Sequence, residues 1–161
     1  MKKFVFTLLL VFVCHLGYAQ GINGLFNEFG SEKNADCVKV SSFMMSLGKM
    51  FAGHDEDAKI IRKIKSIKVL DLESCTASVK ERFNKKVNKL NLKGYDELMR
   101  VNDEGEKVRV LMKTKKETIR ELLFVCTGKE DCTLVQINGK FTKDDINKLV
   151  NQETGKKHGR R

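Results

Sequence analysis

The N-terminal half of the chain repeats its apolar residues mainly at helical spacing. The i, i+3, i+4 pattern of an amphipathic helix recurs in four segments, over residues 22–29, 43–51, 60–64 and 74–90. Two short runs rich in β-branched residues, at 38–40 and 67–72, predict strands between these helices. The longest predicted helix, 74–90, carries apolar side chains on one side and basic side chains on the other.

From Tyr95 onward the apolar period changes to two, which is typical of half-buried strands. The alternation predicts four strands in succession, over residues 95–101, 108–113, 119–125 and 134–137. The third is apolar on both faces and is therefore expected at the centre of a sheet. A final helix is predicted to begin near Thr142 and Asp145, which have the spacing of a capping box.

This order of elements predicts an α+β fold. We expect a two-layer sandwich in which a mainly antiparallel sheet ends in a four-strand C-terminal meander, with the helices packed on one face. A length of 161 residues allows one domain at most. The pattern divides the chain into a leader over 1–19, a single α+β domain over 20–151 and a basic polar tail over 152–161 that we expect to be disordered.

The first 19 residues are typical of a secretory signal peptide. Lys2 and Lys3 precede an apolar run over 4–13, and the small residues Gly17 and Ala19 fit a cut before Gln20. The apolar run is too short for a membrane-spanning helix, which needs about 20 residues. We therefore expect an exported protein, either periplasmic or associated with the outer membrane. The alternatives are an uncleaved anchor and lipid attachment at Cys14, for which the preceding residue is too large.

The charge balance gives the clearest indication of a partner. Without residues 1–19 the chain has 29 basic and 21 acidic residues, a net charge of +8. Such a field attracts anions, so the expected partners are an envelope protein or an anionic glycolipid, with peripheral membrane contact. Nucleic acid is not expected, because no aromatic residues are interleaved with the lysines for base stacking. The candidate anion-binding residues lie on one face of the 74–90 helix and are Arg82, Lys85, Lys86 and Lys89.

Basic residues also gather over 59–68 and at the end of the chain, over 156–161. A surface of this kind can also serve only to keep a protein soluble. Both interpretations stay open from the sequence.

Four cysteines remain after the predicted cut, and an even count in an exported chain favours disulfides. Cys126 and Cys132 flank a five-residue loop, and we expect them at facing positions on paired strands, within bridging distance. The alternative is two buried thiols. The pairing of Cys37 and Cys75 is left open.

The sequence has no established catalytic motif. We expect no metal and no cofactor, because no two cysteines have C-x-x-C spacing and no Gly-rich phosphate loop is present. Glu121 is unusual because it lies within the apolar strand 119–125, where a buried carboxylate needs a partner. A structural ion pair with Arg109 is the favoured explanation. A carboxylate-dependent hydrolase or transferase using Glu121 or Asp145 is the alternative.

The C-terminal half resembles a known family. The resemblance lies in Tyr95-Asp96-Glu97-Leu98-Met99, in Ile119-Arg120-Glu121-Leu122-Leu123 and in the Val-x-Ile-x-Gly run from Val135 to Gly139. These segments are similar to the domain-of-unknown-function family DUF4252, small exported proteins of Gram-negative bacteria. The resemblance implies an exported α+β domain over about 21–150. It implies no catalytic or binding residue, because the family has no established activity.

Together these patterns predict an exported envelope protein that binds a partner and is not an enzyme. The expected binding surface is either the sheet or the basic face of the 74–90 helix. An apolar sheet face left without cover would mark a partner site. Besides the hydrolase or transferase, an exported regulator of cell-surface signalling is an alternative.

Overall fold

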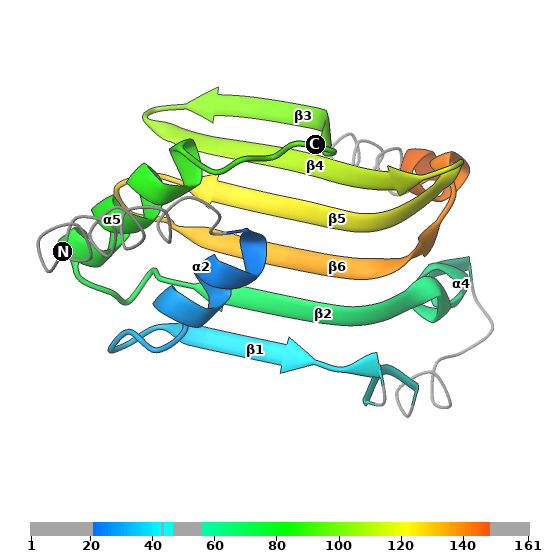
Figure 1. Cartoon of the computed structure of the whole chain (residues 1–161), viewed down its shortest axis with the longest axis horizontal. Coiled ribbons are helices and arrows are strands. Elements are labelled where there is room, and N and C mark those ends of the chain that lie inside the picture. Colours follow the sequence, from blue (N-terminus) through cyan, green and yellow to red (C-terminus); the bar gives the residue numbers. More distant parts are fainter. Residues whose placement is uncertain (1–20, 43, 47–55, 149–161) are drawn as a thin grey trace, which may run out of the picture.

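A computed structural model of the chain describes residues 21–42, 44–46 and 56–148. Six antiparallel strands form one sheet in the order β1-β2-β6-β5-β4-β3 (Figure 1). The strands are β1 (Asp36–Val40), β2 (Ile64–Asp71), β3 (Asp96–Asp103), β4 (Glu106–Lys115), β5 (Thr118–Thr127) and β6 (Thr133–Phe141). Strands β3 to β6 form the predicted meander, so the α+β fold is confirmed.

Two helices cover one face of this sheet, which we call the covered face (Figure 1). They are α2 (Ile22–Phe29) and α5 (Ala77–Asn88). Phe29 of α2 and Phe83 of α5 are fully buried and meet edge to face, with ring centroids 5.3 Å apart. The larger hydrophobic core combines these helices with alternate sheet residues, including Leu70, Leu111, Leu123, Val125 and Leu134.

A second and smaller core lies at the other end of the sheet. Ile60 of α4 (Glu56–Lys63) and Ile146 of a helix over 143–148 pack against it. Its sheet residues Met112, Leu122 and Ile137 form one row across three strands, and they alternate with Leu111 and Leu123 of the larger core. Because successive side chains of a strand point to opposite faces, the small core lies on the open face, opposite α2 and α5. The expectation of helices on one face thus describes α2 and α5, while α4 and the 143–148 helix pack on the open face.

The predicted leader over 1–19, most of the predicted helix over 43–51 and the predicted tail over 152–161 lie outside the described residues. Among the residues that are described, no helix combines the length and apolar character needed to cross a bilayer.

Candidate functional site: a basic pocket beside helix α4

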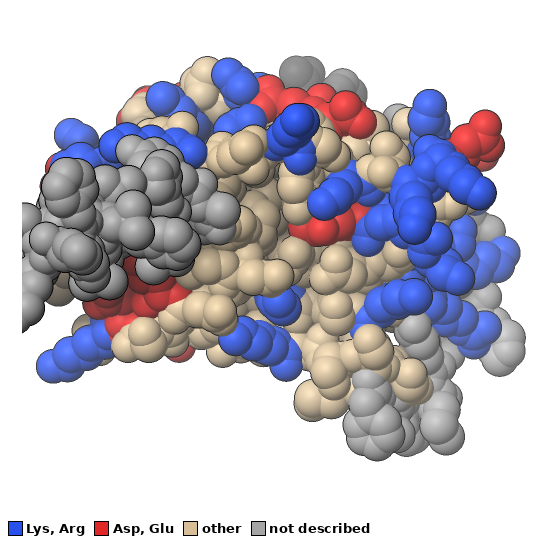
Figure 2. All heavy atoms as spheres, viewed as in Figure 1, with Lys and Arg blue, Asp and Glu red and all other residues tan. Residues whose placement is uncertain are grey.

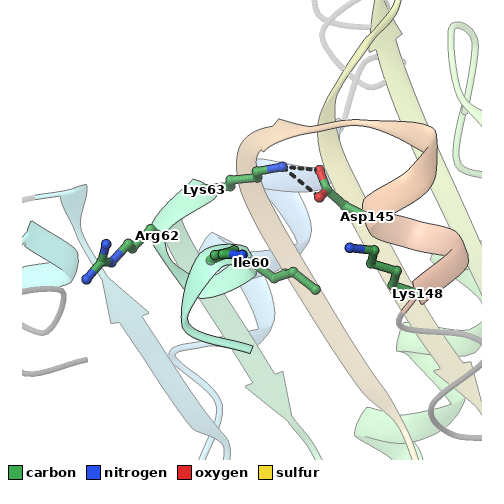
Figure 3. Close-up of a pocket in the computed structure, with 6 residues that line it drawn as sticks. Ile60, Arg62, Lys63, Asp145 and Lys148 are labelled. Carbon is green, nitrogen blue, oxygen red and sulfur yellow. Dashed lines mark hydrogen bonds and ion pairs between the residues drawn. The ribbon is translucent and has the colours of Figure 1, made fainter. Parts of the chain in front are cut away.

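A pocket of about 440 Å³ lies between α4 and the helix over 143–148 (Figure 3). Its volume falls within the range of small-molecule sites, about 300–1,000 Å³. The two helices are distant in sequence, and they meet because Ile60 and Ile146 pack against the same small core. The residues that line the pocket are Lys59, Ile60, Arg62, Lys63, Asp145 and Lys148.

Asp145 is fixed in the pocket wall by a capping box at the start of its helix. Its Oδ2 accepts hydrogen bonds from the backbone N–H of Thr142 at 2.7 Å and from the Thr142 hydroxyl at 2.8 Å. In return, the backbone N–H of Asp145 donates to Thr142 Oγ1 at 3.2 Å. This reciprocal arrangement matches the Thr142-x-x-Asp145 pattern in the sequence. It positions the carboxylate without the help of a ligand.

Lys63 is the second partner of this carboxylate. Its Nζ lies 2.6 Å from Oδ1 and 2.7 Å from Oδ2 of Asp145, whose side chain is only 11% exposed (Figure 3). Burial alone would raise the pKa of Asp145, but the hydrogen bonds from Lys63 and Thr142 outweigh it and lower the pKa. Asp145 is therefore ionised at neutral pH and both of its oxygens are engaged. This is a structural use of the carboxylate and a poor arrangement for a general base.

The remaining charge of the pocket is positive. Lys59, Arg62 and Lys148 line it in addition to Lys63, so among the described lining residues four cationic side chains accompany one carboxylate. Lys148 extends from its helix toward the gap beside Ile60, whereas the guanidinium of Arg62 points away from the Lys63–Asp145 pair (Figure 3). A concave site of one sign of charge concentrates counter-ions, so this pocket favours anionic groups.

The pocket belongs to a wider basic end of the molecule. The segments that meet there are 56–66, 113–121 and 139–148, which together hold eleven Lys and Arg and six Asp and Glu. Figure 2 shows basic side chains gathered at this end of the covered face, near α4 and the adjoining strand ends. The excess of five positive charges makes up much of the net charge of the domain, so the charge is distributed unevenly.

The predicted basic face of α5 is used differently. Arg82 Nη2 lies 2.5 Å from Glu32, and Lys86 Nζ lies 2.5 Å from Glu28 of α2. Lys85 pairs with Glu81 of the same helix at 2.7 Å, and Lys89 is the C-cap residue of α5. These ion pairs tie α5 to α2 and offset part of its charge. Anion binding by α5 stays a prediction, and the structure gives it less support than the α4 pocket.

The expected Cys126–Cys132 bridge is not present, because both residues are free thiols. The strand register explains the difference, since Cys126 of β5 lies opposite Thr133, one residue beyond Cys132. Neighbouring residues of a strand point to opposite faces, so the two side chains diverge. The buried Cys132 sulfur instead contacts Asn84 at 3.3 Å and the Gly128 carbonyl at 3.4 Å.

The thiols are also poorly suited to nucleophilic chemistry. Burial raises the pKa of Cys75, Cys126 and Cys132, and each is therefore a thiol at neutral pH. Cys37 and Cys75, whose pairing the sequence left open, are free as well, and both contribute to the larger core.

Glu121 does not form the expected ion pair with Arg109. Its Oε1 accepts a hydrogen bond from the Tyr95 hydroxyl at 2.5 Å and another from Gln136 Nε2 at 2.7 Å, while Arg109 pairs with Glu97 at 2.8 Å. The prediction was wrong because it lacked the register. Arg109 lies opposite Val125, four residues beyond Glu121 on β5, where a bulge at 119–121 also shifts the pairing.

Tyr95 and Gln136 are therefore residues that the sequence analysis missed. Burial and the neighbouring Glu121 raise the pKa of Tyr95, so its hydroxyl remains a hydrogen-bond donor well above neutral pH. Gln136 is 6% exposed, and its Oε1 is buried without a hydrogen-bond partner among the described residues. The alternation of apolar and polar residues placed Gln136 on a predicted strand, but it did not indicate which side chains would surround Gln136.

The described residues contain no group of three or more His, Cys, Asp and Glu side chains that could hold a metal ion.

The family comparison gives a positive result. The model of a domain of unknown function, DUF4252, matches residues 29–149, which include all six strands and every residue lining the pocket. The chain belongs to this family. No curated protein and no solved structure matches the chain of this DUF4252 domain.

Proposed function

We propose that this DUF4252 protein is an exported binding module that holds an anionic group in the α4 pocket and does not catalyse a reaction. The observation that carries the proposal is the unbalanced charge of the pocket. Among the described residues that line it, four are Lys or Arg and one is acidic, and that one, Asp145, already accepts hydrogen bonds from Lys63 and Thr142. Electrostatic attraction of this kind weakens as salt is added.

Two arguments favour binding over catalysis. Asp145 lines the pocket, but both of its oxygens are engaged and its pKa is lowered, so it does not accept a proton near neutral pH. The thiols whose pKa is raised by burial are unsuited to attack on a substrate. The pocket can therefore hold a charge but offers no acid–base pair.

The experiment is a titration of the protein with inorganic phosphate at low salt, followed by the backbone amide NMR signals. The signals of Ile60 and Lys148 should shift, and Lys148→Glu should reduce the affinity at least ten-fold. Lys107→Glu is a matched control, because it makes the same charge change on an exposed residue at the far end of β4. Equal losses of phosphate affinity in both variants would mean that net charge alone causes the effect, and they would refute binding in the pocket.

Export is tested separately. The apolar run over 4–13 and the small residues before Gln20 support it. Mass spectrometry of the protein recovered from the producing cells should give a chain that begins at Gln20. Recovery of the intact leader on a cytosolic protein would refute export.

A carboxylate-dependent hydrolase or transferase is the second candidate, and Glu121 is the observation that favours it. This carboxylate is held by the neutral donors Tyr95 and Gln136 rather than by a cation. A screen against phosphate esters, carboxylic esters and glycosides tests the idea. This candidate function requires that at least one substrate be converted and that Glu121→Gln abolish the activity without unfolding the protein.

A further inference from the structure

The covered face of the sheet changes from apolar to polar beyond α2. Under α2 and α5 its side chains belong to the larger core, as in Leu70, Leu134 and Leu123. Alternate residues of a strand share a face, so the strand register identifies the residues that continue this face toward α4. Six of them are polar and at least partly exposed, and we call them the polar patch: Lys39, Ser66, Lys68, Lys113, Glu121 and Asn138.

Glu121 lies within the polar patch and is held by two neutral donors. The Tyr95 hydroxyl and Gln136 Nε2 both donate to its Oε1, at 2.5 Å and 2.7 Å, and Gln136 is buried. The other carboxylate oxygen, Oε2, has no hydrogen bond to a described residue. Glu121 is therefore positioned by the fold, and one of its acceptor oxygens is left for a ligand.

The lysines of the polar patch are not neutralised by the chain. Lys39 and Lys68 lie directly opposite each other on β1 and β2, an arrangement of like charges that is destabilising. Lys68 Nζ donates to the neutral Asn23 Oδ1 at 2.7 Å, and Lys113 Nζ lies 5.4 Å from the centroid of the Tyr95 ring. Within the described part of the chain, none of these three lysines forms an ion pair. Figure 2 shows acidic atoms on this half of the face with basic side chains around them.

Asn138 and Ser66 add uncharged hydrogen-bonding groups. They lie opposite each other on β6 and β2, and Asn138 Nδ2 donates to Ser66 Oγ at 3.2 Å. This contact leaves Asn138 Oδ1 as an acceptor and the Ser66 hydroxyl as a donor. Asn138 is also opposite Glu121 on β5, so the acceptors Asn138 Oδ1 and Glu121 Oε2 belong to neighbouring strands.

We propose that the polar patch binds an acidic saccharide. Hydroxyl groups of the sugar donate to Glu121 Oε2 and Asn138 Oδ1, and its carboxylate groups lie beside Lys68 and Lys113. The patch has three cationic side chains and one carboxylate, so a ligand with negative charge offsets the excess. The polar patch and the α4 pocket lie on opposite faces of the sheet, so this inference goes beyond the proposed function and does not depend on it.

The carboxylate of Glu121 decides between ligand classes. It repels a ligand that presents only negative charge, whereas it accepts hydrogen bonds from hydroxyl groups. An acidic peptide supplies carboxylates without side-chain hydroxyls. The acyl chains of a phospholipid find no apolar side chain among the six residues of the patch. An acidic saccharide presents both hydroxyl donors and negative charge in one molecule.

The experiment compares three ligands by NMR titration at low salt. Hexagalacturonate carries hydroxyls and carboxylates, maltohexaose carries hydroxyls alone, and hexaglutamate carries carboxylates without hydroxyls. With hexagalacturonate, the backbone amide signals of Lys113 and Asn138 should shift. Maltohexaose and hexaglutamate should each bind at least ten-fold more weakly.

Glu121→Gln separates hydrogen bonding from charge. The new side chain keeps an oxygen for Tyr95 and Gln136, but it replaces the acceptor Oε2 by an N–H donor and removes a negative charge. We expect it to lower the affinity for hexagalacturonate at least five-fold and to raise the affinity for hexaglutamate. A surface that attracts anions by charge alone would bind both ligands more tightly in this variant.

Lys113→Gln tests the patch through an exposed side chain, so it remains informative if Glu121→Gln unfolds the protein. It should lower the affinity for hexagalacturonate at least five-fold. Lys107→Gln is the matched control, because it makes the same change on the same strand and face, about 20 Å away along β4. Lys107→Gln and the pocket variant Lys148→Gln should each change this affinity less than two-fold.

Three results would overturn the inference. The first is a wild type whose patch signals do not shift with hexagalacturonate. The second is hexaglutamate binding as tightly as hexagalacturonate, with Glu121→Gln strengthening both, which would indicate an acidic peptide or charge alone. The third is an equal loss of hexagalacturonate affinity in Lys148→Gln and Lys113→Gln, which would place the saccharide in the α4 pocket or reduce the effect to net charge. Phosphate binding in that pocket is measured separately, so it can stand when the saccharide site fails.

Discussion

Helices α5 and α4 are both rich in lysine and arginine, yet they use their charge differently. On α5, Arg82 and Lys86 pair with carboxylates of Glu32 and Glu28, so its basic residues hold two helices together over the larger core. On α4, Lys63 pairs with Asp145, and Lys59, Arg62 and Lys148 are further cationic residues among the described ones that line the pocket. The comparison shows that a count of basic residues does not locate a binding site. The balance of cationic and acidic side chains around each site matters as well.

The two ends of the sheet also differ in the size of the hydrophobic core that they carry, and this difference gives the largest expected effect. Phe83→Ala should lower the free energy of unfolding by about 3–5 kcal/mol, because a fully buried aromatic ring that contacts Phe29 is replaced by a cavity. Ile146→Ala, at the partly exposed small core, should cost about 1–2 kcal/mol less than that. Urea denaturation measures both. Equal losses would mean that the two cores contribute equally.

The capping box gives the next effect. Asp145→Ala should destabilise the protein by about 1–2 kcal/mol at pH 7, because it removes the acidic half of the capping box and the partner of Lys63. The pKa of Asp145 is lowered in the folded state, so its contribution is present above the unfolded value near 4 and is lost as the pH falls through the folded value.

Urea denaturation of the wild type and Asp145→Ala at pH 7 and at pH 2.5 tests this dependence. The difference in unfolding free energy between the two proteins should shrink at the lower pH. Thr142→Ala is a useful companion, because it removes the reciprocal cap but leaves the Lys63–Asp145 pair in place. A difference that is independent of pH would contradict the ion pair.

Tyr95 gives a smaller effect with a clear spectroscopic signal. Tyr95→Phe should cost about 1.5 kcal/mol, because the buried hydrogen bond to Glu121 is lost. The pKa of Tyr95 is raised, so the stability that it contributes is present below pH 10 and falls as the pH rises toward the folded value. A chain that begins at Gln20 has Tyr95 as its single tyrosine and has no tryptophan, so absorbance at 295 nm reports on it alone. Ionisation at its ordinary pKa in the folded protein would contradict the buried network.

The local parts of this structure were predictable from the sequence, and the parts that depend on register were not. The period of two located the strands from Tyr95 onward, and the Thr142-x-x-Asp145 spacing identified the cap. Arg109 misses Glu121 because it lies opposite Val125, four residues away, and the separation of Cys126 from Cys132 depends on a one-residue offset. A helical or strand period carries no information about which residue of a neighbouring strand lies opposite.

The pocket shows the same limit on a larger scale. The sequence drew attention to the basic stretch over 59–68, and it separately predicted a helix from Thr142. Nothing local indicates that these segments meet. They do so because β6 returns between β2 and β5, which brings the helix after β6 beside the helix before β2. Carboxylate pairing on α5 is likewise set by how α2 crosses it.

The smallest expected effect is the sharpest test of the comparison between α5 and α4. Lys85→Glu should leave the affinity for inorganic phosphate within two-fold of the wild type, because Lys85 is 70% exposed beside Glu81 and lies far from the pocket. Lys148→Glu makes the same charge change and should lower the affinity at least ten-fold. NMR titration at low and at 0.3 M salt separates local from general electrostatics, since exposed charges are screened beyond about 6 Å at the higher salt. If Lys85→Glu weakened phosphate binding as much as Lys148→Glu, the basic face of α5 would be the anion site and the carboxylates beside it would not have neutralised it.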